Sequence, residues 1–376
     1  MDNKLKFVIA GAIILAVIAT SIPLTNSPKD GKSASAITNS LTSSASSNNS
    51  TISINGNSPN TENKIIRIGY FANINHAQPM IGLANGDYQK VLGDNVQIET
   101  QIFSAGPSAI EALFANQIDV AYVGPNPTIN GYMQSGGQAI KVVSGAASGG
   151  AIFVLRNDAG INSVKDFAGK KFASPQLGNT QDVALRKYLL ANGYKTKENG
   201  GNVEVLTAAN PDIYTLMIKK DIDGAWVPEP WGAKLIHEAN AHIFLDERQL
   251  WPNGEFVSTN LVARTDFLQK NPELIQKLIE ATINETIWIN GHPDDAYKVF
   301  NIELQKLTGK ALPATELVDG FSRLKLTWDP IKTSLYKSAN DAYDVGFLKQ
   351  KPKLDGIYDL DLLNKVLAHK GLLPIQ

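Results

Sequence analysis

The chain has 376 residues, of which 43% are hydrophobic and 19% charged, and its formal net charge is -1. This is enough apolar material for about two domains, and the near-neutral charge argues against nucleic-acid binding, which usually needs a basic surface. The absence of cysteine excludes disulfides, thiolate nucleophiles, iron–sulfur clusters and cysteine-ligated zinc.

Residues 1–25 contain two lysines followed by a long apolar run, FVIAGAIILAVIATSIPL. The run approaches the roughly 18 residues that can span a bilayer, and the lysines before it favour an exported remainder. Because no A-x-A-like cleavage site follows, an uncleaved membrane anchor is favoured over a cleaved signal peptide, and both alternatives stay open. We expect the rest of the chain on the extracytoplasmic face of the membrane, or secreted or periplasmic if the leader is removed.

Residues 26–63 are rich in Ser, Asn and Thr and have no large apolar cluster. Such a segment cannot bury enough surface to offset its chain entropy, which predicts a disordered linker. Asn48 and Asn49 lie in N-x-S/T sequons, as does Asn284 further along. These are acceptor sites only in a host that glycosylates proteins.

From residue 64 onward, short β-rich runs alternate with helical patterns. The first strands are predicted at IIRIGYF, VQIETQIF and DVAYV, and a helix at AGPSAIEALFANQ. In GPNPTINGYM, Asn126 is predicted as an N-cap and Pro127 as the first helical residue. After a glycine-rich break at 148–150, the same alternation continues through FASPQLGNTQDVALRKYL, VEVLTA and GAWV.

The last third of the chain is predicted to be mostly helical. A long helix should begin after Asn271 and end at Gly291, and further helices are expected at about 294–307, 330–345 and 359–368. The alternation before them predicts an α/β architecture with mostly parallel sheets, and about 310 residues are too many for one typical domain. We therefore expect two α/β lobes.

Four corners between a strand and a helix are candidate binding positions, because open α/β sheets bind ligands at the carboxyl ends of their strands. The first three begin helices whose free N–H groups and dipoles favour an anion. The fourth holds Trp226, Glu229 and Trp231 among prolines. The corners are residues 73–76, 124–128, 176–181 and 227–231.

Several kinds of chemistry lack their sequence patterns. There is no GxxxxGK[ST] phosphate loop, and SGAASGG lacks the G-x-S-x-G spacing that would make Ser148 a nucleophile. His237 and His242 are five residues apart rather than four, which does not fit a helical zinc motif. We therefore expect a binding protein and not an enzyme, with no metal and no cofactor.

Four segments in order carry a family resemblance: IRIGYFANINHAQPMIGLANG, IDVAYVGPNPTINGY, FASPQLGNTQDVALRKYL and GAWVPEPWGAKLI. Together they resemble the substrate-binding components of ABC importers for aliphatic sulfonates, taurine, nitrate or bicarbonate. The resemblance covers about residues 66–265. It implies a type II periplasmic-binding-protein fold, with a hinge and a ligand cleft between the lobes.

The resemblance also implies a domain division and a set of partners. Residues 64–150 and 256–376 would form lobe 1, and residues 151–255 would form lobe 2. The protein would be a monomer that captures a small anionic ligand, while an ABC permease and a cytoplasmic ATPase are other chains. An aliphatic sulfonate or taurine is the first expectation. Nitrate, bicarbonate, a thiamine-pyrimidine precursor, or a role as a tethered sensor module are the alternatives.

Carried over by position, the resemblance implies ligand contacts at the corners and at the glycine-rich break. They are Asn75, His76, Gly124, Asn126, Ser148, Gly149, Asn179 and Thr180.

The fourth corner leaves two alternatives open for each of its residues. Trp226 and Trp231 either wall the ligand's carbon stem or pack the core of lobe 2. Glu229 either faces the cleft, where it would bind the ammonium group of taurine, or points away to accept backbone N–H bonds or pair with a lysine. We favour the second alternative for Glu229, because buried carboxylates are usually satisfied locally.

Overall fold

The computed structural model describes residues 64–376. The predicted anchor or signal peptide at 1–25, the linker at 26–63 and the sequons at Asn48 and Asn49 lie outside the described residues. Within residues 64–376, no helix is long and apolar enough to cross a membrane.

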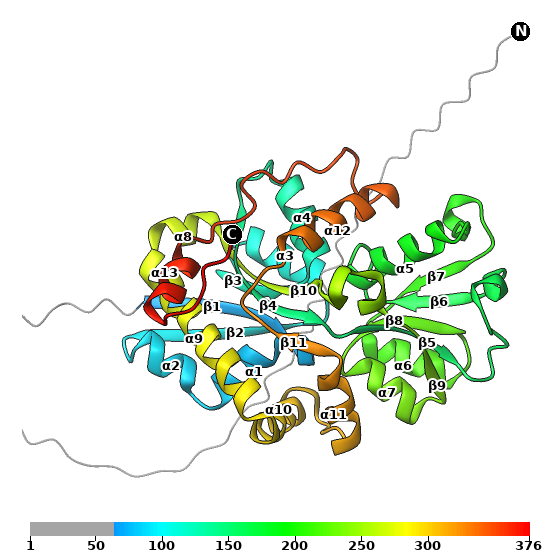
Figure 1. Ribbon diagram of the computed structural model, residues 1–376, viewed down its shortest axis with the longest axis horizontal. Helices are drawn as coiled ribbons and strands as arrows, with labels where there is room; N and C mark the ends of the chain where they lie inside the picture. The colour runs from blue at the N-terminus through cyan, green and yellow to red at the C-terminus, as the bar shows by residue number, and fades with distance from the viewer. Residues whose placement is uncertain (1–63) are drawn as a thin grey trace, which may run out of the picture. The chain divides into compact units, whose positions relative to one another are not determined.

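A six-stranded sheet organises lobe 1, which combines the first and the last parts of the described chain (Figure 1). Its strand order is β11-β4-β10-β3-β1-β2, in which β1, β2 and β3 are parallel and β10 returns antiparallel between β3 and β4. The strands are β1 (Lys64–Phe71), β2 (Val96–Phe103), β3 (Val120–Val123), β4 (Ile140–Gly149), β10 (Val257–Arg264) and β11 (Leu324–Leu326).

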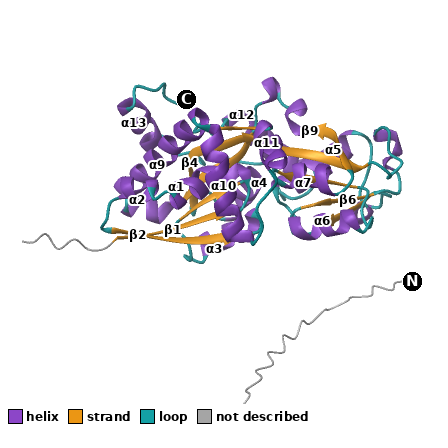
Figure 2. Ribbon diagram, turned by 90° about the horizontal axis from the view of Figure 1, so that it is seen from below, coloured by secondary structure: helices purple, strands orange, loops and turns teal. Residues whose placement is uncertain are grey.

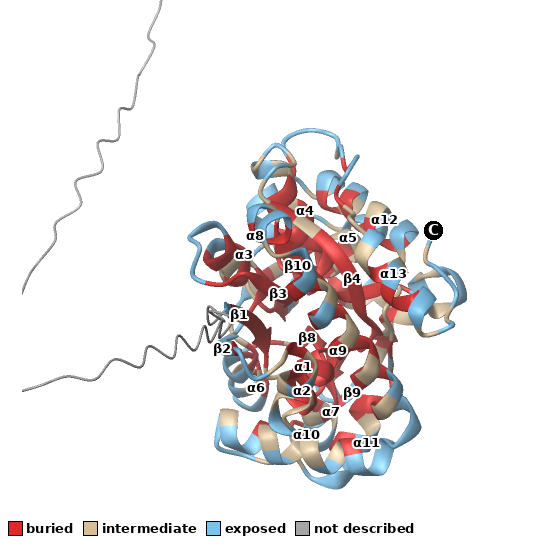
Figure 3. Ribbon diagram, turned by 90° about the vertical axis from the view of Figure 1, so that its left-hand side faces the viewer, coloured by how far each residue is buried: buried red, intermediate tan, exposed pale blue. Residues whose placement is uncertain are grey.

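Helices cover both faces of this sheet, and the strands between them are largely buried (Figure 3). One core joins the sheet to α1 (Ala77–Ala84), α2 (Asp87–Leu92), α8 (Thr265–Lys270), α9 (Pro272–Gly291), α10 (Pro293–Thr308), α11 (Ala314–Ser322) and α13 (Asp361–His369). The other joins it to α3 (Gly106–Phe114), α4 (Pro125–Gln134) and α12 (Lys332–Asp344).

A second sheet of five strands, in the order β7-β6-β8-β5-β9, organises lobe 2 (Figure 2). Its strands are β5 (Ala151–Arg156), β6 (Lys171–Ser174), β7 (Glu204–Thr207), β8 (Gly224–Pro228) and β9 (Ala241–Asp246). Two apolar clusters pack it against α5 (Thr180–Ala191), α6 (Asn210–Ile218) and α7 (Trp231–Glu238). The mixed α/β fold with two lobes, predicted from the alternation and the resemblance, is confirmed.

The chain passes between the two sheets at two places. The first is Gly150, between β4 and β5, where Gly149 and Gly150 have φ angles of +78° and +71°. Residues with a side chain rarely adopt this left-handed conformation, which explains the glycine pair. The second passage is formed by two 3-10 helices, η4 (Glu247–Leu250) and η5 (Pro252–Gly254), between β9 and β10.

The long helix predicted between Asn271 and Gly291 is confirmed as α9, and Asn284 lies inside it. Helix α4 begins two residues earlier than predicted: Gly124 and not Asn126 is the N-cap, and Pro125 and not Pro127 is the first helical residue. The sequence patterns did not predict α11, β9, β10 or β11. His237 lies in α7 and His242 in β9, so the two histidines do not share a helix.

Candidate functional site

A small cavity lies where the carboxyl ends of strands from both sheets face one another. Its volume is about 30 Å³, which is space for about two water molecules. It is lined by Phe71, Asn73, Asn75, His76, Ser104, Ala105, Gly124, Asn179, Thr180, Gln181, Asn210, Pro228, Ser258 and Thr259.

The starts of five helices border this cavity. Asn73, Asn75 and His76 precede α1, while the N-caps or first residues of α3, α4, α5 and α6 are Ala105, Gly124, Asn179 and Asn210. Prolines in the first turns of α3, α4 and α6 suit positions where the backbone N–H has no partner within the helix.

None of these five helices has a side-chain hydrogen bond at its N-cap. No N-cap side chain therefore competes for the first-turn N–H groups of α3, α4, α5 and α6, whose helix dipoles add positive potential. At α1 the N–H groups of Ile74, His76 and Ala77 are already bonded to backbone carbonyls, so this start contributes its dipole and side chains. The convergence of several such starts makes the cavity suited to an anion.

Within the part of the chain that the structure describes, no lysine, arginine, aspartate or glutamate lines the cavity. The only titratable ring in the lining is His76, which is buried and lies 4.4 Å, centroid to centroid, from the ring of Phe71. Burial lowers the pKa of His76 to about 3, so the ring is neutral near pH 7. The positive potential of the cavity therefore comes from backbone dipoles and not from a cationic side chain.

Within the described residues, buried polar atoms without a hydrogen-bond partner gather in this lining. They are Asn75 Oδ1, His76 Nδ1, Thr180 Oγ1, Asn210 Oδ1 and Thr259 Oγ1. Buried polar atoms are usually paired, so five unpaired ones around one cavity mark a place for a polar ligand or ordered water.

The two lobes approach closely at Gly124 of lobe 1 and Thr180 of lobe 2. A Cβ atom on Gly124 would lie 2.4 Å from Thr180 Oγ1, a distance that real Cβ contacts do not reach. A side chain at position 124 would therefore force Thr180 or the two lobes to shift.

Of the residues predicted to contact the ligand, the structure brings five together in the cavity lining: Asn75, His76, Gly124, Asn179 and Thr180. Asn126 does not line it, because this residue lies inside α4 and its side chain donates to the Ser338 carbonyl at 3.2 Å.

Ser148 and Gly149 also lie outside the cavity lining. Ser148 Oγ accepts a hydrogen bond from the Phe256 N–H at 3.2 Å, and the Gly149 carbonyl accepts one from Asn75 Nδ2 at 3.0 Å. These two residues hold the β4 end and the Asn75 side chain in place.

Trp226 is fully buried in the core of lobe 2 and does not form a ligand wall. Its indole stacks on Phe153 with 5.4 Å between ring centroids, and its Nε1 donates to Glu247 Oε2 at 2.7 Å. Trp231 packs against the other apolar cluster of lobe 2. The core alternative therefore holds for both tryptophans.

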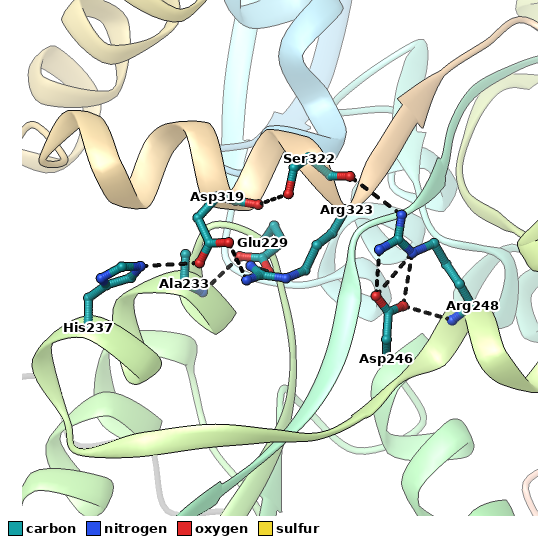
Figure 4. A network of polar contacts seen from close by, with 8 residues as sticks. All are labelled: Glu229, Ala233, His237, Asp246, Arg248, Asp319, Ser322 and Arg323. Carbon is teal, nitrogen blue, oxygen red and sulfur yellow. Dashed lines mark hydrogen bonds and ion pairs between the residues drawn. The ribbon is translucent and has the colours of Figure 1, made fainter.

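Glu229 is fully buried and points away from the cavity. Its Oε2 accepts the Ala233 N–H at 2.9 Å, and its Oε1 pairs with Arg323 Nη1 at 2.7 Å (Figure 4). These contacts agree with the favoured alternative, in which Glu229 points away and accepts a backbone N–H bond. Its ionic partner is an arginine of lobe 1 and not a lysine. Burial raises the pKa of Glu229, and the Arg323 charge opposes that shift.

Sequence reasoning missed several residues of the lining. Asn210 begins α6 directly after β7, so the rule used for the other corners would have found it. Ser258 and Thr259 lie on β10, which enters the six-stranded sheet from a distant part of the chain, and no local pattern indicates that placement. Phe71 and Pro228 end β1 and β8 and supply apolar surface.

The fold and this cavity define a two-lobed α/β protein of the periplasmic-binding-protein class. A family model described as the NMT1-like family matches residues 59–303, and the chain belongs to that family.

Among curated proteins, a Brucella abortus (strain 2308) protein provisionally named as a binding protein is 25% identical over 311 residues, covering 78% of this chain and 89% of that protein. The taurine-binding periplasmic protein of Escherichia coli K12 is 24% identical over 214 residues, covering 57% of this chain and 63% of that protein.

Two solved structures share the fold. The alkanesulfonate-binding protein SsuA of Xanthomonas axonopodis pv. citri aligns with a TM-score of 0.67 and 15% identity, covering 80% of this chain and 99% of that chain. The periplasmic nitrate-binding protein NrtA of Synechocystis PCC 6803 aligns with a TM-score of 0.66 and 16% identity, covering 82% of this chain and 89% of that chain.

Proposed function

We propose that this protein is the extracytoplasmic solute-binding component of an ABC importer and captures a small oxyanion by closure of its two lobes. The observation that carries the proposal is the meeting of five helix starts at one uncharged cavity between the lobes. A permease and an ATPase on other chains would complete the importer. The names of the taurine-, alkanesulfonate- and nitrate-binding relatives support this class of ligand.

Among these ligands, an alkanesulfonate without an amine fits the cavity better than taurine. Glu229 is paired with Arg323 outside the lining, so the cavity offers no carboxylate to an ammonium group. Phe71, Ala105 and Pro228 offer apolar surface to a short carbon stem, the role that the sequence had suggested for Trp226.

Nitrate is a second candidate because the cavity is small. About 30 Å³ admits a ligand of a few heavy atoms with little movement, whereas a sulfonate with a carbon stem requires the lobes to part slightly. The absence of a charged side chain from the lining also suits a monovalent anion better than a divalent one, whose desolvation costs more.

A thermal-shift panel on ligand-stripped protein tests the proposal. Ethanesulfonate, taurine, nitrate, bicarbonate and phosphate are compared with a neutral aminopyrimidine at matched ionic strength. A ligand at 100 times its Kd adds about 2.7 kcal/mol to the apparent stability. We expect a rise in Tm with ethanesulfonate or nitrate and a smaller one with taurine. A rise with the aminopyrimidine alone, or with none of the compounds, would contradict an oxyanion-binding role.

A further inference from the structure

A network of charged side chains joins the lobes beside the cavity, along the contact between α7 of lobe 2 and α11 of lobe 1 (Figure 4). Arg323, directly after α11, reaches Glu229 at 2.7 Å and Asp319 at 2.5 Å. Asp319 also lies 3.2 Å from His237 Nε2 of α7, and Arg248 donates to the Ser322 carbonyl at 3.4 Å. The network therefore links three segments of the chain that do not line the cavity.

The Glu229 carboxylate lies between two glycines, one on each helix of this contact. A Cβ on Gly232 of α7 would lie 2.8 Å from Glu229 Oε1, and a Cβ on Gly320 of α11 would lie 3.3 Å from Oε2. A side chain at either position would crowd the carboxylate. The close approach of the two helices thus encloses a charge whose one cationic partner among residues 64–376 is Arg323.

The backbone of Glu229 connects the ion pair to the cavity wall. Its carbonyl accepts the Ile74 N–H at 3.1 Å, next to Asn75 and His76, and its N–H donates to the Gly150 carbonyl at 2.9 Å. The Gly150 N–H in turn donates to the Arg323 carbonyl at 2.9 Å. The two partners of the ion pair are therefore bonded to the residue through which the chain first passes between the sheets.

We propose that Arg323 is a positioning residue whose ion pair with Glu229 clasps the two lobes and sustains a closed population before any ligand binds. In the described structure Glu229 is fully buried, so its charge needs Arg323. We expect opening of the lobes to bring water to the carboxylate, which would then need Arg323 less. Removing one partner of a buried pair leaves an uncompensated buried charge, and we expect that cost to be larger in the closed than in the open arrangement. The proposal concerns closure and does not depend on which ligand the protein binds.

A distance measurement on ligand-free protein tests whether the Arg323–Glu229 ion pair favours closure of the lobes. The chain has no native cysteine, so Gln97→Cys on β2 and Lys165→Cys in lobe 2, both exposed positions, give one spin-labelled pair across the lobes. Bound ligand is removed by unfolding and refolding, and double electron–electron resonance then gives the fractions of closed and open protein. We expect a closed fraction in the otherwise unchanged chain, and Arg323→Met to lower the closed-to-open ratio at least about tenfold.

Three further variants distinguish the effect of the ion pair on lobe closure from a general loss of structure. Adding Glu229→Gln to Arg323→Met removes the buried charge and should restore much of the closed fraction. Glu229→Gln alone should have a smaller effect, because Arg323 keeps Asp319. Lys187→Met is the matched control: Lys187 of α5 also pairs across the lobes, with Asp344 at 2.5 Å, but that pair is partly exposed and should change the ratio less than about threefold.

Far-ultraviolet circular dichroism confirms that each variant is folded before the distances are compared. The proposal is overturned if the ligand-free chain shows only an open distance, or if Arg323→Met leaves the distribution unchanged. It is equally overturned if the double variant is as open as Arg323→Met, because the loss would then come from packing and not from charge.

Discussion

Asn75 shows how one side chain of the site serves two purposes. Its Nδ2 is fixed by the Gly149 carbonyl and by Ser258 Oγ at 2.9 Å, and a carbonyl can only accept, so the orientation of the amide is defined. Its Oδ1 is then left without a partner next to the cavity. The passage between the lobes therefore orients a group of the binding site.

His76 should make the protein less stable in mild acid. Its pKa in the folded chain is about 3, below the usual 6.5, so the unfolded chain binds more protons between these values. Stability attributable to the neutral ring is therefore lost as the pH falls from about 6.5, by about 1.4 kcal/mol per unit. Between pH 6.5 and 5, the chain should lose about 2 kcal/mol relative to His76→Gln. Urea unfolding of both proteins at the two pH values measures the difference, and parallel pH profiles would contradict it.

Individual residues of the site could be predicted only where a local pattern fixes their position. Asn179 and Thr180 follow a short strand and begin a helix, and the sequence shows both facts. Glu229 could not be understood in the same way, because Arg323 is 94 residues away in the chain and reaches it only through the contact of two lobes. Trp226 was ambiguous for a similar reason, since its partner Glu247 is on another segment.

The helix start is the element that gives this site its chemistry. At α5, Asn179 is the N-cap but makes no capping hydrogen bond with its side chain, and it lines the cavity. An aspartate there is an equally good N-cap and favours the helix dipole, yet it places a negative charge where an anion is expected.

The Asn179→Asp variant should therefore fold normally but bind the anion more weakly. We expect Tm in the absence of ligand to stay unchanged or rise slightly, while the affinity for ethanesulfonate or nitrate falls at least about tenfold by isothermal titration. Asn271→Asp is the matched control, because Asn271 is the N-cap of α9 and is not in the cavity lining. Equal affinity in the two variants would show that the start of α5 does not face the ligand.

Elements with strong periodicity were predictable, and those that depend on tertiary pairing were not. The helix after Asn271 has twenty residues, starts with Asn-Pro and ends at a glycine, and the sequence predicted these limits. Strand β11 has three residues and exists because it pairs with β4, while β10 depends on returning between β3 and β4. Short strands of this kind carry little local signal, since their stability comes from their neighbours.

The whole molecule should be most stable in mildly acidic solution. Burial raises the pKa of Glu247 and of Glu285 to about 7, so the folded chain binds more protons than the unfolded chain between about pH 4.5 and 7. Their contribution to stability is therefore complete below about 4.5 and is lost as the pH rises to about 7. His76 already loses stability as the pH falls from about 6.5, but between pH 7 and 4.5 the gain from the two glutamates outweighs the loss from one histidine. Below about 4.5 the glutamates add nothing more, and His76 and the ion-paired Glu238, whose pKa is lowered to about 2, both lose stability.

Tm measured across pH 4–8 should accordingly pass through a maximum near pH 5. Glu247→Gln combined with Glu285→Gln should flatten the decline between pH 5 and 7, because an amide does not titrate. Glu273→Gln, at an exposed position of the same helix as Glu285, is the control and should leave the profile unchanged. A Tm that rises steadily from pH 5 to 7 would contradict the assignment.

Strands β4 and β10 are hydrogen-bonded neighbours up to Ser148 and Val257, and the two passages between the lobes leave from these same ends. Two connections that leave side by side from one pair of hydrogen-bonded strands form a two-stranded hinge. We expect this hinge to let lobe 2 rotate about one axis relative to lobe 1 and to resist rotation about the other axes. We therefore expect the motion of lobe 2 to follow a single degree of freedom, so that one well-placed pair of reporters records the whole conformational cycle.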